Sequence, residues 1–361
     1  MPNTGQAPPL YSSRPVLTVG GQTPDSLAEH LLELVVEETV EGLFHAEATF
    51  GNFPVKNPSD GYLYFDRKLL DFGKPFVVQM GAGIASSTVF TGRLMALEGR
   101  FPHLDAPQIL VKAEDRLQDL RMTRRTRTFK NMTDADLFQQ VASEQGLKAQ
   151  IDVSGPSYIC LAQVNQSDLQ FLRERACAVD AELWVDDTTL SVQSRAKRKA
   201  NEVTLIYGEG LLEFSAIADL ANQATGFSVT GWDVAGKQPL KYRATSAALG
   251  GEVNGDVTGS AALQQAIGTR EQTVVHALPT SAQEAQALAE AGYRRWARRF
   301  VTGTGLAEGD GRIQVGTCLT LQQVGPLFNG KFYVTAVRHI YDPAMGYRTW
   351  FAVERPGIGQ S

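Results

Sequence analysis

The chain has 361 residues, of which 43% are hydrophobic and 20% are charged, and these values are typical of a folded globular protein. Its net charge of −5 argues against a general nucleic-acid binder, and no apolar run approaches the roughly 20 residues that a membrane helix needs. We therefore expect roughly two to four domains, no nucleic-acid partner and no stable membrane insertion.

The cysteines and the N-terminus predict where the chain folds. Cys160, Cys177 and Cys318 are odd in number and lack CxxC spacing, so we expect reduced, mostly buried thiols in a chain made in the cytoplasm. The first residues have neither the basic start nor the apolar core of a signal peptide. Two local basic clusters, 121–130 and 195–199, are predicted to be solvated faces or linkers.

Residues 1–115 are predicted to form a β domain. Strict alternation at 44–50 places Phe44, Ala46, Ala48 and Phe50 on one face, as in a half-buried strand. Further strands are expected at 14–19, 31–38, 76–80, 88–97 and 108–113. Short strands with hardly a helix predict a small antiparallel barrel or sandwich.

Residues 116–200 are predicted to be a helix-strand insertion. Thr133 with Asp136 is a capping-box start for a helix that ends before Gly146. Asn165 or Ser167 is expected to cap a second helix, followed by a strand at 182–185.

Residues 201–361 are predicted to form a second β domain. Strands are expected at 203–206, 212–217, 226–233, 312–315, 318–321, 330–341 and 347–354. Ser281 and Glu284 open a helix that is expected to run to Gly303. The Gly-rich segment 246–272 carries few large apolar groups and is predicted to be a long mobile loop.

No pattern in the chain predicts catalysis, a cofactor or a metal. The glycines of 81–86 precede strand formers instead of the helix that a phosphate loop needs, so we interpret them as a loop between strands. The five histidines are scattered without ligand spacing, and no GxSxG elbow occurs. We therefore expect no enzyme, no small-molecule substrate and no cofactor.

Three short segments resemble the phage late control protein D family: TRTF at 126–129, NQSDLQFL at 165–172 and LWV at 183–185. That family includes the hub part of VgrG spikes and the central baseplate hubs of contractile tails and injection systems. The order of elements from about residue 11 to about residue 355 is also similar to that of the family.

The resemblance implies a mainly β fold with an α/β insertion: two tube-like antiparallel β-barrels plus the helix-strand insertion. It further implies a homotrimer, in which six barrels form a pseudo-six-fold ring that adapts a hexameric tail tube to a trimeric spike. The implied partners are the tail tube protein, the spike and other baseplate proteins. The alternative is a cell-wall-degrading or carbohydrate-binding tail-associated protein.

The chain stops soon after its last predicted strand, so we expect the spike to be a separate polypeptide. In spike proteins of this family the needle continues from the hub's C-terminus, which makes the C-terminal tail the candidate spike-side contact. Its residues are Arg355, Pro356, Gly357 and Ile358. The particle could be a phage tail, an extracellular injection system or a secretion apparatus, and the sequence leaves these three open.

Overall fold

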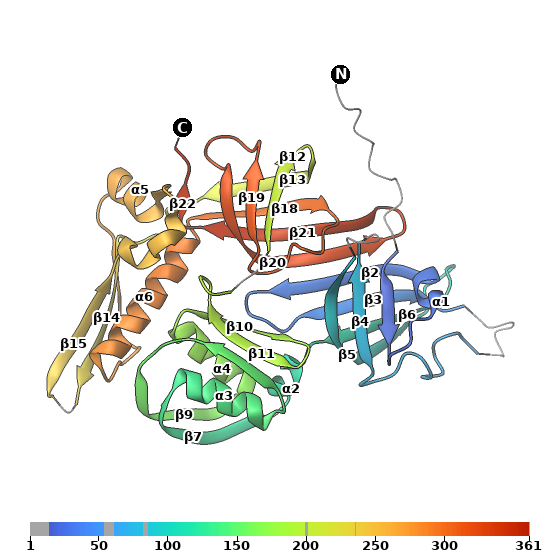
Figure 1. Cartoon of the computed structure of the whole chain (residues 1–361), viewed down its shortest axis with the longest axis horizontal. Helices are drawn as coiled ribbons and strands as arrows, with labels where there is room; N and C mark the ends of the chain where they lie inside the picture. The colour runs from blue at the N-terminus through green and yellow to red at the C-terminus, as the bar shows by residue number, and fades with distance from the viewer. Residues whose placement is uncertain (1–13, 54–60, 82–85, 199–200, 235, 361) are drawn as a thin grey trace.

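The computed structural model describes residues 14–53, 61–81, 86–198, 201–234 and 236–360. The fold is mainly β, with helices concentrated in the middle and in one arm of the chain (Figure 1). The glycine-rich segment 81–86 falls largely outside these residues, as does position 199 of the second basic cluster. The mainly β class with an α/β insertion, predicted from the sequence, is confirmed.

The first unit is a curved antiparallel sheet whose strands follow the order β1-β4-β5-β6-β3-β2. Alternation along the third strand buries Ala46, Ala48 and Phe50 completely, as the sequence predicts. The elements are β1 (Val16–Val19), α1 (Asp25–Glu29), β2 (Leu31–Thr39), β3 (His45–Gly51), β4 (Pro75–Met80), β5 (Ser87–Arg100) and β6 (Gln108–Glu114).

The insertion packs short helices on a three-stranded sheet, β10-β11-β8, and on the antiparallel pair β7-β9. Thr133 and Asp136 form the predicted capping box, and Ser167 caps the second helix by accepting from the Gln170 amide. The elements are α2 (Leu117–Arg121), β7 (Arg124–Thr133), α3 (Asp134–Glu144), β8 (Lys148–Asp152), β9 (Ser157–Ser167), α4 (Asp168–Ala178), β10 (Ala181–Asp186) and β11 (Thr189–Ser194).

The second β unit is a closed six-stranded barrel, β20-β19-β12-β13-β18-β21, in which β21 returns to β20. Its elements are β12 (Glu202–Tyr207), β13 (Gly210–Ala218), β18 (Val301–Glu308), β19 (Cys318–Gln322), β20 (Gly330–Asp342) and β21 (Gly346–Arg355). The barrel differs from the expected antiparallel pattern because β12 runs parallel to β19 and to β13. Gly208 and Gly210, both at positive φ, allow the tight bend between β12 and β13.

Strand β20 belongs to both β units. Its first part pairs with β19, from Gly330 to Tyr333, and its second part pairs with β2, from Ala336 to Tyr341. The two units are therefore joined into one twelve-stranded sheet rather than tethered by a linker.

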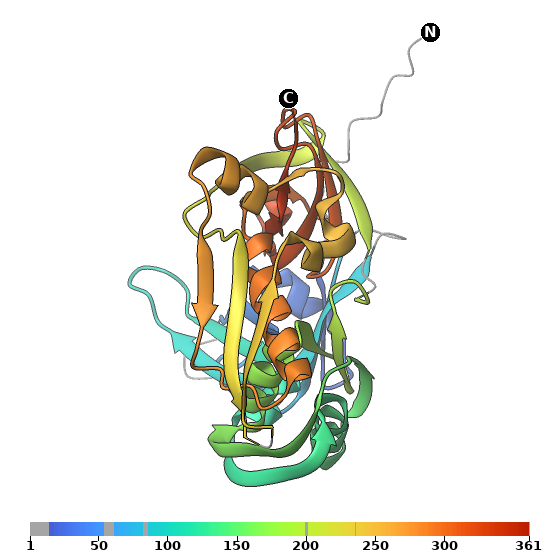
Figure 2. The ribbon, with the colours of Figure 1, turned by 90° about the vertical axis from the view of Figure 1, so that its left-hand side faces the viewer.

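An arm inserted between β13 and β18 contains a long helix covered by a small sheet (Figure 2). The elements are β14 (Gly226–Asp233), β15 (Gln238–Ala244), η3 (Ser246–Val253), β16 (Val257–Thr258), α5 (Gly259–Ala266), β17 (Glu271–Val274) and α6 (Ala282–Arg298). The strand β22 (Gly357–Ile358) follows the barrel and pairs with β16 of the arm. The prediction of a mobile loop at 246–272 is wrong. The segment forms short helices whose side chains Leu249 and Leu263 are buried, and its strand β16 pairs with β22.

Two further predictions for residues 201–361 are wrong. No strand forms at 312–315, where the Thr317 hydroxyl accepts a hydrogen bond from the Gln314 amide within a turn. Helix α6 ends at Arg298, and the chain then enters β18, a strand that the sequence did not predict.

Candidate functional site

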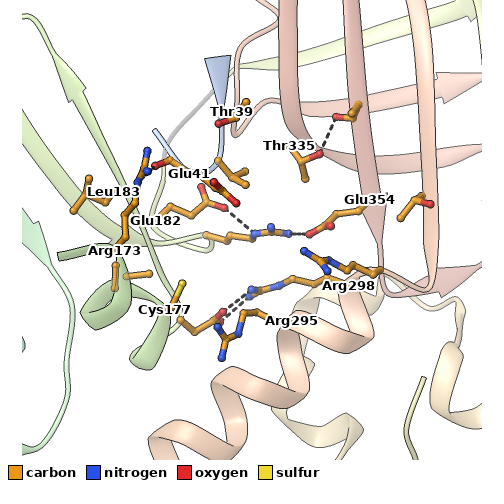
Figure 3. A pocket seen from close by; sticks show the side chains of 18 of the residues that line it. Thr39, Glu41, Arg173, Cys177, Glu182, Leu183, Arg295, Arg298, Thr335 and Glu354 are labelled. Carbon is orange, nitrogen blue, oxygen red and sulfur yellow. Dashed lines mark hydrogen bonds and ion pairs between the residues drawn. The ribbon is translucent and has the colours of Figure 1, made fainter. Parts of the chain in front are cut away.

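A cleft of about 1530 Å³ lies where the insertion, the arm and the barrel meet (Figure 3). One wall is formed by α4 and the last turns of α6, and the floor by strands β13, β18, β20 and β21 of the barrel. The floor side chains are mostly small: Ser215, Ala216, Thr302, Gly303, Thr304, Thr335 and Ala352.

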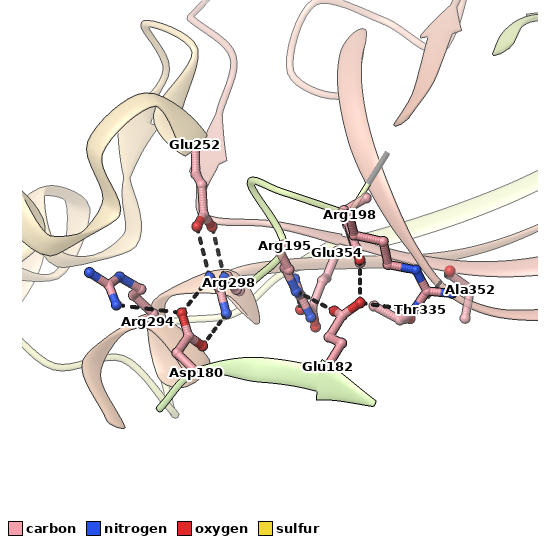
Figure 4. Close-up of polar contacts among 11 residues, drawn as sticks. Asp180, Glu182, Arg195, Arg198, Glu252, Arg294, Arg298, Thr335, Ala352 and Glu354 are labelled. Carbon is pink, nitrogen blue, oxygen red and sulfur yellow. Dashed lines mark hydrogen bonds and ion pairs between the residues drawn. The ribbon is translucent and has the colours of Figure 1, made fainter. Parts of the chain in front are cut away.

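The inner end of the cleft is an ionic junction built on Arg298, near the end of α6 (Figure 4). Its guanidinium donates to both Asp180 oxygens at 2.6 and 2.8 Å and to both Glu252 oxygens at 2.8 Å. Arg298 is only 4% exposed, so its guanidinium needs a counter-charge and hydrogen-bond acceptors, and the two carboxylates supply both. The junction ties α6 to the insertion and to η3.

Arg195 makes the next link of the junction. Its guanidinium lies 2.8 Å from Glu182 of β10 and 2.6 Å from Glu354 of β21, and it stacks 4.2 Å over the ring of Tyr333. The insertion and the barrel are therefore joined by a largely shielded arginine held between two carboxylates (Figure 4).

Arg198 extends the same junction to the first sheet. It contacts Glu182 at 3.0 Å and Glu38 at 3.2 Å, while its guanidinium lies 4.2 Å over Trp184. Glu38 also accepts a hydrogen bond from the Val315 amide. The first sheet, the insertion and the barrel thus meet at connected ion pairs.

Burial dominates the protonation of Glu38. Desolvation raises its pKa from 4.5 to about 7, even though the charge of Arg198 and the Val315 amide act in the opposite direction. For Glu252 the balance is reversed: burial raises its pKa, but the hydrogen bonds and charge of Arg298 outweigh it and hold the pKa below its ordinary value.

The second basic cluster was predicted to be solvated, and this is wrong for its arginines. The side chains of Arg195 and Arg198 are 14% and 6% exposed, and each forms ion pairs with two carboxylates of the junction. In the first cluster, Arg121 and Arg124 line the cleft, while Arg127 pairs with the buried Asp168 at 3.0 Å. Sequence reasoning missed these partners because they lie far along the chain.

The α6 wall of the cleft carries arginines without acidic partners. Arg295 and Arg299 lie one turn apart near the end of α6 and are exposed, and neither forms an ion pair with any residue that the structure describes. Cys177 is also exposed on this surface. The prediction of buried thiols is wrong, because Cys160 is exposed as well and Cys318 is half-buried.

The predicted tail site is turned toward the chain itself. Arg355 is 5% exposed and donates to the carbonyls of Leu327 and Asn329 at 2.6 and 3.0 Å. Pro356 and Gly357 are also buried, and Ile358 pairs with Val257 in a short antiparallel ladder. The Arg355 side chain is therefore not available to a partner in this conformation.

Within the described ranges, no group of three or more His, Cys, Asp and Glu side chains is arranged to hold a metal ion. His339 is buried against Tyr347, whose hydroxyl lies 2.8 Å from Nδ1, and desolvation lowers the pKa of this histidine to about 4. None of the described helices is long and apolar enough to span a bilayer.

The fold is similar to that of phage tail proteins, as comparison with solved structures shows. The 43 kDa tail protein of prophage MuSo2 from Shewanella oneidensis superposes with a TM-score of 0.71 at 15% identity, over 95% of this chain and 98% of that one. A tail protein from Neisseria meningitidis gives a TM-score of 0.69 at 15% identity, over 97% and 98% of the two chains.

A third solved structure is the E. coli c3393 protein, described as a type VI secretion component structurally similar to T4 tail proteins gp27 and gp5. It gives a TM-score of 0.58 at 12% identity, over 96% of this chain and 79% of that one. A family model described as the Alg8 N-terminal domain matches residues 18–342, so the chain belongs to that family. No curated protein sequence matches the chain.

Proposed function

We propose that the protein is a structural baseplate hub of a contractile tail or injection system, which adapts a hexameric tail tube to a trimeric spike. The observation that carries this proposal is the fold likeness to tail proteins along nearly the whole of both chains. Membership of the late control protein D and VgrG hub group is part of the proposal, and it rests on the sequence segments 126–129, 165–172 and 183–185.

The proposed assembly is a homotrimer in which each chain supplies two β units to a ring. The rigid connection through β20 supports this idea, because a ring requires the two units to keep one relative orientation. The first sheet ends at β1, which pairs with β4 and with no other strand of the described residues, and an edge of this kind could pair with a neighbour in a ring.

A structural role rather than catalysis is part of the same proposal. Two carboxyl groups have a pKa raised to about 7 by burial, Glu38 and Asp115, and such groups are candidate general acids. However, Asp115 is 2% exposed and accepts from the amides of Phe44 and Leu117, and Glu38 is held in the junction. Their positions support structural roles.

The test combines the mass and shape of the purified protein. Light scattering is expected to give three times the mass of one chain, and averaged electron micrographs are expected to show a three-fold ring that binds the tube protein and the spike. A stable monomer, or clearing of a cell-wall zymogram, would overturn the hub proposal.

The spike-side end is also proposed to be the C-terminus. Because Arg355 to Gly357 are buried, the contact would be made by residues that follow the β22 ladder. Truncation after Ile358 retains that ladder, so an intact trimer with weaker spike binding is expected. Unchanged spike binding would remove the C-terminus from the proposal.

A further inference from the structure

The cleft has the size and floor of a peptide site. Its volume of about 1530 Å³ exceeds the range of about 300–1,000 Å³ that is usual for small-molecule pockets. The barrel strands that form its floor are paired on both sides, so they offer no backbone edge for strand addition. An occupant would therefore lie on the small floor residues and contact side chains of the walls.

The charge of the cleft selects the kind of peptide. Its lining has two more arginines than carboxylates, in a chain whose net charge is −5. The inner arginines are already neutralised, because Arg195 and Arg298 each meet two carboxylates. Arg124 and Arg173 have no carboxylate partner among the described residues either, but they donate to main-chain carbonyls. The charge left free for a ligand is thus on Arg295 and Arg299, which face the same side of α6.

We propose that this cleft is the docking site for an acidic peptide segment of a partner protein. Carboxylates of the segment meet Arg295 and Arg299, whose guanidinium groups form charge-assisted hydrogen bonds with such acceptors. A nucleic-acid backbone is disfavoured, because its phosphate charge would continue beyond the two arginines over a chain whose net charge is −5, whereas a peptide can carry its carboxylates only where the arginines lie. This inference goes beyond the proposed hub role, which names no ligand for the cleft.

The first test measures binding of a fluorescein-labelled peptide of alternating glutamate and alanine, with a glutamine-alanine peptide as control. We expect binding of the acidic peptide alone, weakening as salt is added. Arg295→Gln combined with Arg299→Gln is expected to weaken it about tenfold or more, which is a loss of about 1.4 kcal/mol. Arg14→Gln, an exposed arginine on the first sheet's edge, is the matched control and is expected to bind normally.

The second test is a footprint on the cysteines. Cys177 lines the cleft and Cys160 lies on β9 outside it, and both are exposed. The bound acidic peptide is expected to slow alkylation of Cys177 at least several-fold while Cys160 reacts unchanged. This internal control separates occupation of the cleft from a general effect on thiol reactivity.

Several results would overturn the proposal. They are no binding by the wild-type protein, equal binding by the double variant, or equal protection of both cysteines. A fall in the mass of the assembly on Arg295→Gln and Arg299→Gln would instead indicate that a second copy of this chain occupies the cleft. None of these outcomes tests the hub role, which is judged from the mass and shape of the wild-type protein.

Discussion

The core of the insertion and the junction that attaches it to the rest of the chain are built from different chemistry. The core is apolar, and Phe138, Leu172 and Val192 are completely buried in it. The junction is nearly as well shielded but charged, with Arg298 4% and Glu182 8% exposed. Apolar contacts are non-directional, whereas each buried charge requires a particular partner. We infer that the core stabilises the unit and the junction fixes its orientation.

The comparison predicts its largest effect at Arg298. Arg298→Ala removes the main counter-charge of the buried Asp180, which keeps only Arg294 at 3.5 Å, and of the half-buried Glu252, so we expect a loss of about 3–5 kcal/mol in the free energy of unfolding. Arg295→Ala, on the same helix but exposed, is the control and is expected to change stability by about 0.5 kcal/mol or less. Denaturant titrations of both variants measure the difference, and similar losses would contradict the assigned role of the junction.

The junction is also predicted to depend on pH through Glu38. Because its folded pKa is raised from 4.5 to about 7, the folded state binds more protons than the unfolded state between these values. This contribution is fully present below about pH 4.5 and is lost as the pH rises through about 7, and it amounts to as much as about 3 kcal/mol.

Glu38→Gln isolates that contribution from other titrating groups, including Asp115. The stability of the wild type minus that of Glu38→Gln is expected to fall between about pH 5 and pH 7.5, since glutamine does not titrate. Denaturant titrations across this pH range provide the measurement. A difference that is constant or rises with pH would show that the Glu38 carboxyl stays charged when buried.

The same contrast explains what the sequence could predict. Local signals identified the insertion's helices, because a capping box such as Thr133 with Asp136 lies within one turn. The junction has no local signal: Arg298 and its partner Asp180 are 118 residues apart, and Arg198 and Glu38 are 160 apart. The basic clusters 121–130 and 195–199 are evident in the sequence, but the burial of their arginines depends on carboxylates supplied by other parts of the chain.

The missed strand β18 has another physical cause. Glycine is depleted in strands, and this segment carries Gly303 and Gly305, so its pattern favours a loop. In the barrel these glycines allow neighbouring groups to approach closely. A Cβ added at Gly305 would lie 2.4 Å from the Phe351 ring, so the tertiary contact overrides the local preference.

A substitution at Gly305 therefore tests whether close apolar packing stabilises the barrel, as it stabilises the core of the insertion. Gly305→Ala is expected to destabilise the protein by about 1–3 kcal/mol, because the ring of Phe351 and the strand must shift to admit a methyl group. Gly251→Ala is the matched control: its added Cβ meets nothing within 4 Å, so stability is expected to stay the same or rise slightly. Thermal unfolding of the two variants decides, and an unchanged Gly305→Ala protein would mean that the barrel is loosely packed there.

The smallest predicted effect concerns the insertion alone. Thr133→Ala removes the hydroxyl that accepts from the Asp136 amide at the start of α3, which should lower the free energy of unfolding by about 1 kcal/mol. Thr133→Ser keeps the hydroxyl and serves as the control. Thr133 shares no partner with Arg298, so the losses from Thr133→Ala and Arg298→Ala should add to within about 0.5 kcal/mol in the double variant. A larger coupling energy would mean that the junction and the insertion's helices unfold as a single network, and the separation of orientation from stability would then fail.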